Sequence, residues 1–141
     1  MALLPVRTFD PKMVVITFGT TPISGYAEGT FVRVKRSGDA FTKSKGAGGD
    51  VERVNRNQGD FEVGITLQQT APVNTELSAV LAADQVTNAG VFPLTIKDAL
   101  TNKVLFFAAE AWIRVDPEWE DGDELNAREW TFDTGVGANL L

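Results

Sequence analysis

The sequence contains no cysteine and no histidine among its 141 residues. Without cysteine the chain has no disulfide, no thiolate metal ligand and no thiol nucleophile. Without histidine it lacks the commonest general base and the commonest ligand of transition metals. These two absences favour a protein that is not an enzyme and that works without a cofactor or a bound metal.

Long apolar runs are missing as well. The longest is the six-residue stretch Val104–Ala109, whereas a membrane-spanning helix needs about 20 apolar residues. The segment Met1–Val6 has no basic region, and its apolar stretch is shorter than the roughly 7 to 15 residues of a signal-peptide core. We therefore expect no membrane span and no secretory signal. With 43% apolar residues, residues 1–141 fit one soluble domain with its own core.

The charges that are present are segregated along the chain. Residues 1–58 carry nine Lys or Arg against five Asp or Glu, a net charge of +4. Residues 59–141 carry four against fourteen, a net charge of −10. Oppositely charged regions allow copies of one chain to pair head to tail. The acidic total argues against nucleic-acid binding, which needs clustered cations, and indicates a surface that repels DNA.

A basic, glycine-rich segment covers residues 37–59 and holds five of the thirteen glycines. Residues 41–44 and 51–55 flank the turn Gly46–Asp50, a pattern that predicts a long projecting β-hairpin with a flexible tip. Long polar excursions from a compact domain are usually functional or disordered, and the basic content here favours docking on an acidic neighbour. The expected contact residues are Phe41, Lys43, Lys45, Arg53 and Arg56.

The rest of the chain predicts a mainly β fold, a β-sandwich with one flanking helix. Residues 73–81 carry an apolar stripe at helical spacing, with Thr70 expected as N-cap. Residues 104–113 carry apolar side chains at both strand parities, so both faces must be covered by a sandwich layer or by another subunit. Residues 1–12 predict an extended N-terminal arm that is ordered only where something covers it. The other expected strands are residues 13–18, 31–36, 60–68, 92–97 and 128–134.

Residues 116–124 form an acidic loop with six carboxylates: Asp116, Glu118, Glu120, Asp121, Asp123 and Glu124. They do not fit the calcium loop of an EF-hand, because placing Gly122 at the sixth position puts Pro117 where the first Asp is needed. A glycosidase would need two carboxyl groups roughly 5 to 10 Å apart in a cleft, which crowding on one loop does not supply. We interpret the loop as solvated or as a contact with another subunit.

Three other patterns suggest binding or catalysis. Gly46–Gly49 resembles a phosphate-binding loop, but the Lys-Ser/Thr that follows such a loop is missing. Ser44 and Lys45 suggest a nucleophile and its base, but adjacent residues on a strand point to opposite faces, so we discard this pair. Trp119 on the acidic loop leaves open a carbohydrate-binding module, whereas core packing is expected for Trp112 and Trp130. A hydrolase built on the acidic loop is a further alternative.

Three segments, in this order and spacing, resemble the tail tube proteins of contractile-tailed bacteriophages: Gly64–Leu77, Phe92–Asp98 with its hairpin, and Glu129–Gly135. The order and spacing carry the resemblance rather than any single string. It covers roughly residues 13–135 and is strongest from residue 60 onward. The sequence departs from the family at the N-terminal arm and at the dense acidic loop.

The resemblance implies a virion structural protein, made in the host cytoplasm. It implies six copies in a ring, with rings stacked into a hollow tube, strands lent to an inner barrel and the hairpin bridging to the adjacent ring. It also implies tail sheath, baseplate and terminator proteins as partners, and DNA that passes through the lumen without specific binding. A tube, hub or terminator protein of a related contractile injection machine remains an alternative.

Overall fold

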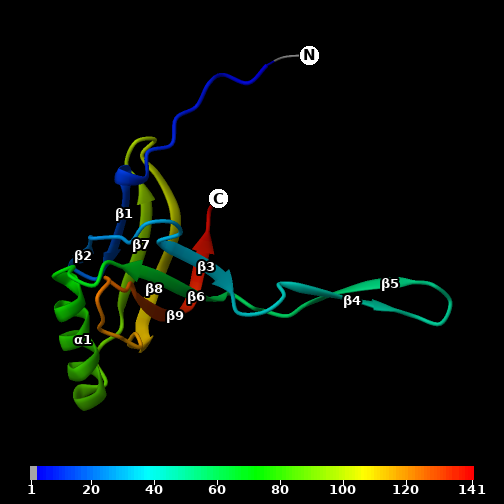
Figure 1. Ribbon diagram of the computed structural model, residues 1–141. Coiled ribbons are helices and arrows are strands. Elements are labelled where there is room, and N and C mark those ends of the chain that lie inside the picture. Colours follow the sequence, from blue (N-terminus) through cyan, green and yellow to red (C-terminus); the bar gives the residue numbers. More distant parts are fainter. Residues whose placement is uncertain (1–2) are drawn as a thin grey trace.

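The computed structural model describes residues 3–141, which form one seven-stranded antiparallel sheet, one helix and a separate two-stranded hairpin (Figure 1). The strand order in the large sheet is β2-β1-β7-β8-β9-β6-β3, and β4 pairs only with β5. The predicted mainly β fold with one helix is confirmed. The elements are η1 (Pro11–Met13), β1 (Val14–Phe18), β2 (Thr21–Ile23), β3 (Val32–Arg36), β4 (Phe41–Lys45), β5 (Val51–Asn55), β6 (Asp60–Leu67), α1 (Val73–Thr87), β7 (Phe92–Asp98), β8 (Lys103–Val115) and β9 (Arg128–Asn139).

The core lies inside a sheet that folds over on itself. Phe18 on β1 meets Phe132 on β9 edge to face at 5.1 Å between ring centroids, although β7 and β8 separate these strands in the sheet. Phe61 on β6 and Phe106 on β8 meet in the same way at 5.1 Å across β9. Edge-to-face packing is a favourable arrangement for aromatic rings. The two layers expected of the sandwich are thus the two halves of one continuous, curved sheet.

Helix α1 covers one end of this core. Val73 and Leu77 are buried, as the apolar stripe predicts. The predicted N-cap is wrong: Pro72 occupies that position, and no side chain caps the helix there. Asn74 ties the first turn down instead, because its amide donates to the carbonyl of Gln68 and accepts from the indole Nε1 of Trp130, both at 2.9 Å.

Strand β8 differs in two ways from the sequence prediction for residues 104–113. Its pairing with β7 shifts by one residue between Leu94–Ala108 and Phe92–Ala111, a β-bulge that exchanges the inward and outward positions. Ala108 and Ala111 are therefore both buried in the same core, whereas the opposite face, with Phe107 42% exposed, is not covered within residues 3–141; its coverage by another subunit stays a prediction. Trp112 lies half-buried on the outer face rather than in the core, whereas Trp130 is buried as predicted.

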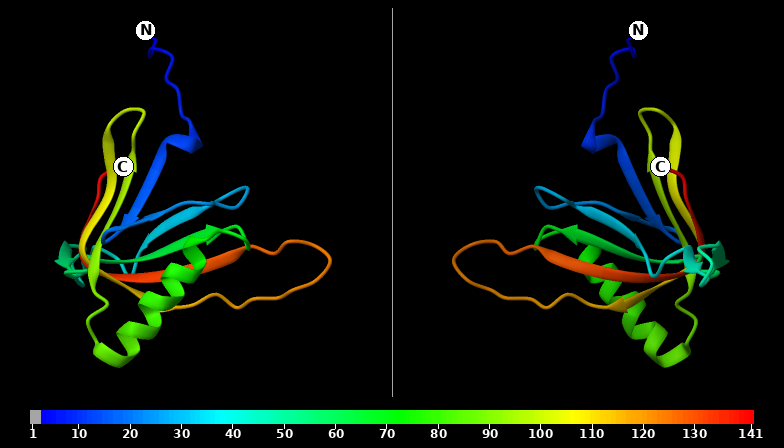
Figure 2. Two further views of the ribbon diagram at one scale, coloured as in Figure 1. Left: turned by 90° about the vertical axis from the view of Figure 1, so that its left-hand side faces the viewer. Right: turned by 90° about the vertical axis from the view of Figure 1, so that its right-hand side faces the viewer.

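Some elements differ from the sequence prediction. The three-residue β2 pairs with β1 where a turn was expected, and β9 continues to Asn139, beyond the predicted end at residue 134. Residues 3–10 have no regular structure and run away from the body in all views (Figures 1 and 2). Within residues 3–141, no helix has the length and apolar character needed to cross a membrane.

Candidate subunit-contact surfaces

The β4–β5 hairpin projects far from the body of the molecule (Figure 1). Backbone bonds define both of its ends: Arg56 N donates to Ala40 O at 3.0 Å at the base, and Gly46 N donates to Asp50 O at 2.8 Å near the tip. All five residues of β5 and four of the five in β4 are exposed. An isolated two-stranded hairpin is at best marginally stable in water, so this one lacks the packing that stabilises the rest of the sheet.

The register of the hairpin gathers its cations on one face. Lys43 lies directly opposite Arg53, and Lys45 and Phe41 share their side of the ribbon. The Arg53 guanidinium lies 4.5 Å from the centre of the Phe41 ring. Arg56 follows β5 at the base. Like charges directly opposite one another destabilise a strand pair, and no ion pair within residues 3–141 involves any of these four cations. We call the side chains of Phe41, Lys43, Lys45 and Arg53 the cationic face.

The acidic loop projects from another side of the molecule than the hairpin (Figure 2). Asp121 Oδ1 accepts from Gln69 Nε2 at 2.9 Å and lies 3.4 Å from the Arg128 guanidinium. Trp119 is 65% exposed, with the Arg128 guanidinium 5.9 Å from its ring centre. The structure therefore does not bring the predicted basic and acidic contact residues together within one chain. Within the described range, no three carboxylates converge as a metal site would require.

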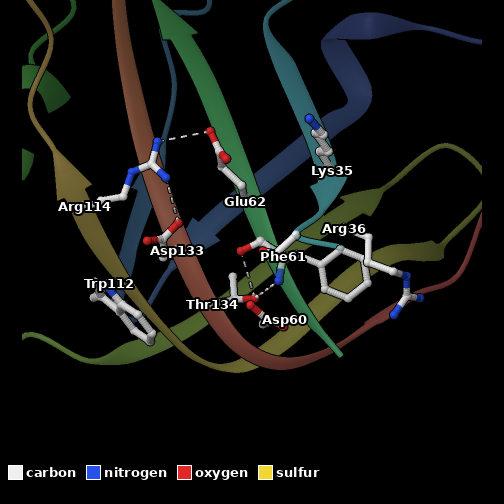
Figure 3. Close-up of a pocket in the computed structure, with 10 residues that line it drawn as sticks. Lys35, Arg36, Asp60, Phe61, Glu62, Trp112, Arg114, Asp133 and Thr134 are labelled. Carbon is white, nitrogen blue, oxygen red and sulfur yellow. Dashed lines mark hydrogen bonds and ion pairs between the residues drawn. The ribbon is translucent and has the colours of Figure 1, made fainter. Parts of the chain in front are cut away.

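A second charged cluster lies on the outer side of the large sheet (Figure 3). Arg114 of β8 bridges Glu62 of β6 at 3.2 Å and Asp133 of β9 at 3.5 Å. Burial raises the pKa of the Asp133 carboxyl above its ordinary value; Arg114 opposes this rise, and Glu62 and Asp60 add to it. These side chains and Trp112 line a shallow hollow of ≈ 350 Å³.

We define the open face as the side of β3, β6, β9 and β8 that points away from the core. A second ion pair lies on it, Arg33 with Glu129 at 3.3 Å. The open face carries five acids and three cations: Asp60, Glu62, Glu110, Glu129, Asp133, Arg33, Lys35 and Arg114. Our sequence reasoning did not identify this surface. Its signal was the polar alternate positions of residues 60–68 and 128–134.

The architecture is that of tube and tube-terminating proteins from contractile systems. The chain shares its fold with the anti-feeding prophage tube-terminating cap (TM-score 0.65, 10% identity, 98% of this chain and 94% of that one). It matches the sheath/tube terminator of the extracellular contractile injection system PVC (0.65, 11%, 94% and 96%). It also matches a chain of the PVC sheath-tube complex (0.63, 11%, 94% and 92%).

Sequence comparison defines the family. Residues 14–141 match the family described as Bacteriophage PhiTE tail tube protein, and the chain belongs to it. "Structural protein ORF10" of Pseudomonas phage KPP10 is 28% identical over 133 residues, which cover 89% of this chain and 76% of that protein. The resemblance seen in the sequence is confirmed, and the chain has a tube-related structural role in a phage.

Proposed function

We propose that the protein is the subunit of a phage tail tube that assembles itself into stacked hexameric rings around a conduit for DNA ejection. The family supports the tube role, and the curated relative supports a place in the virion. Its partners are further copies of itself, the tail sheath, the baseplate and a tail terminator. Synthesis takes place in the host cytoplasm. The work of such a protein is assembly, without covalent chemistry.

The observation that carries the proposal is the β4–β5 hairpin. Within residues 3–141 its strands β4 and β5 pair with no other strand, it exposes Phe41 and Val51, and it sets Lys43 against Arg53. Like charges held on an exposed ribbon are relieved when acidic groups of a partner approach them. The acidic loop at 116–124 provides such groups on a different side of the molecule, so one copy offers what the next requires. The hairpin of one ring subunit therefore docks on an acidic surface of the adjacent ring.

The open face gives the tube its inner wall in this proposal. The other side of the same strands is already covered by the core and by α1. The open face has more acids than cations, and Arg33 and Arg114 are held by Glu129, Glu62 and Asp133. DNA binds tightly where clustered Lys and Arg release its counterions. A wall whose arginines are paired and whose net charge is negative lets DNA slide past.

Charge reversal on the hairpin tests the docking role. The variant Lys43→Glu with Lys45→Glu should keep the fold of the subunit, because both side chains are exposed and outside the core. It should lose tube growth, because the cationic face then repels the acidic acceptor. Electron microscopy of purified protein reads out rings and tubes, and circular dichroism checks the fold.

The matched control is Lys97→Glu with Lys103→Glu on the β7–β8 hairpin, which makes the same change in net charge. This control should still form tubes. Tubes of normal length from the Lys43/Lys45 variant would refute hairpin docking. Single rings that never stack, formed by the unmodified protein, would indicate a terminator rather than a tube subunit.

A further inference from the structure

The N-terminal arm carries apolar side chains that its own fold leaves largely uncovered. Leu3, Leu4 and Val6 are 90%, 75% and 99% exposed, and Phe9 is 66% exposed. Four large apolar residues within seven positions form an exposed cluster of the kind that marks an interaction site. Arg7 is the only charged residue among residues 3–9. The arm therefore has the composition of a buried segment.

The start of the fold directs the arm away from its own body. Pro11 begins the η1 turn, in which Met13 N donates to Asp10 O at 2.9 Å and Lys12 N donates to Asp10 Oδ1 at 3.0 Å. Proline fixes its own backbone angle and keeps the preceding residue extended. Both further views show the arm leaving the sheet from this turn (Figure 2). Residues 3–9, when extended, reach about 23 Å.

The same end of the molecule has an apolar opening into the core. We call it the mouth: a hollow of ≈ 270 Å³ lined by Val14, Phe31, Val32, Ile96 and Leu105. The mouth lies between the two halves of the folded sheet: β1 and β7 line it from one half, and β3 lines it from the other. Of the residues that the structure describes, those lining the mouth are all uncharged. Phe9 of the same chain also lines the mouth, so one apolar side chain of the arm is already part of this apolar site.

The mouth also has a free strand edge. Strand β3 ends the order of the large sheet, and within residues 3–141 it pairs only with β6. An unpaired edge is a template for an extended segment, which adds backbone hydrogen bonds to side-chain burial. An arm without helical structure, with Pro5 in it, is such a segment.

We propose that the mouth receives the N-terminal arm of a neighbouring copy, which lies extended along β3 with Leu4 and Val6 on the side that faces the hollow. The chain's own arm leaves the sheet at the η1 turn, and Phe9 is the one residue of residues 3–9 that lines the mouth of the same molecule. When extended, residues 3–9 reach about 23 Å, so they can make contacts well away from their own body. Arm exchange rests on the proposed self-assembly and deepens it: it is an apolar contact between copies, separate from the charged hairpin contact.

Disulfide trapping tests the proposal, because the natural chain contains no cysteine. Leu4→Cys and Thr30→Cys are each prepared singly; Thr30 is exposed and lines the mouth. The two proteins are mixed, assembled and oxidised, and non-reducing gels with mass spectrometry identify the linked peptides. A dimer joining residue 4 of one copy to residue 30 of another is expected. The matched control pairs Leu4→Cys with Val86→Cys, which is 82% exposed on α1 and should give no such dimer.

Three outcomes would overturn arm exchange: no 4–30 dimer, equal cross-linking in the Val86 control, or, in the double variant Leu4→Cys/Thr30→Cys, a disulfide formed within one chain. Electron microscopy of the same samples separates the two proposals. Tubes without the 4–30 link would sink arm exchange alone. A 4–30 link between copies that build no rings or tubes would sink the tube proposal alone.

Discussion

The Asp133 carboxyl shows how the open face alters a single residue. Burial is the largest influence and raises its pKa, while the Arg114 guanidinium pulls the pKa down. The Asp133 carboxyl therefore binds its proton more tightly in the folded state than in the unfolded chain. The free energy of unfolding should fall as pH rises from the ordinary value of 3.8 through the raised folded pKa, and then level off.

Replacing Asp133 with Asn should remove this pH dependence from the acid range. Urea denaturation at several pH values measures the unfolding free energy of the variant and of the natural chain. The difference between the two should change between pH 3.8 and the raised pKa of Asp133. NMR titration of the carboxyl carbon provides a direct reading. A pKa at or below 3.8 would contradict the account.

At the residue scale, the sequence predicts which side chains are buried better than which ones meet. The burial of Phe61, Val63 and Ile65 follows from simple alternation. Glu62 and Arg114 lie 52 positions apart in the sequence, and neither segment taken alone predicts their contact. Only the folded sheet order sets β6, β9 and β8 side by side.

At the scale of elements, the hairpin has little internal stabilisation. The facing pair Lys43 and Arg53 adds repulsion to a ribbon without a core. Segments with few buried contacts open locally more often than the rest of a fold. In the isolated subunit, the amides of β4 and β5 should therefore exchange hydrogen much faster than those of β6 and β9.

The single substitution Lys43→Glu should have opposite effects on the free and the assembled protein. The new carboxylate at position 43 faces Arg53 across the ribbon, and such a pair contributes roughly 0.2 to 1 kcal/mol. Amide exchange in residues 41–55 of the isolated subunit should therefore slow by up to a few-fold. The substitution also weakens the cationic face, so tube growth should be slower. Hydrogen exchange and light scattering measure the two effects.

The control lies on the other side of the same ribbon. Ser44→Glu places a carboxylate opposite Glu52 and should speed amide exchange in the free subunit. If Lys43→Glu left both the exchange and the growth rate unchanged, the like-charge argument would be wrong.

Each difference between the predicted and the observed elements has a local physical cause. The bulge in β8 needs its register with β7 to be visible, so an alternation read along residues 104–113 alone gives two apolar faces. Pro22 makes β2 read as a turn, although proline is tolerated on an edge strand. Gly135 and Gly137 make the end of β9 read as a loop, yet their strand is paired to β8.

At the scale of the whole molecule, the open face predicts how an assembled tube treats DNA. The variant Glu110→Lys with Thr131→Lys makes this face more positive by three charges, two from the first change and one from the second. Tubes of this variant should retain short DNA in their bore, protected from nuclease and released by salt, because clustered cations bind phosphate. Tubes of the natural chain should retain none.

The same change in charge on the helix serves as control. Glu76→Lys with Ser78→Lys places two lysines on α1, outside the proposed bore. DNA bound to these tubes should remain open to nuclease. Nuclease-protected DNA in the helix variant, or its absence in the open-face variant, would place the bore elsewhere.

The hairpin and the acidic loop leave the molecule on different sides, and this has a consequence for any stack built from it. A contact that joins two different patches is directional, so repeating it gives a filament with a polarity. One end would always display unsatisfied ribbons and the other unsatisfied acceptors. The proteins that begin and finish such a structure would then have to be unlike each other, because each must recognise a chemically distinct terminus.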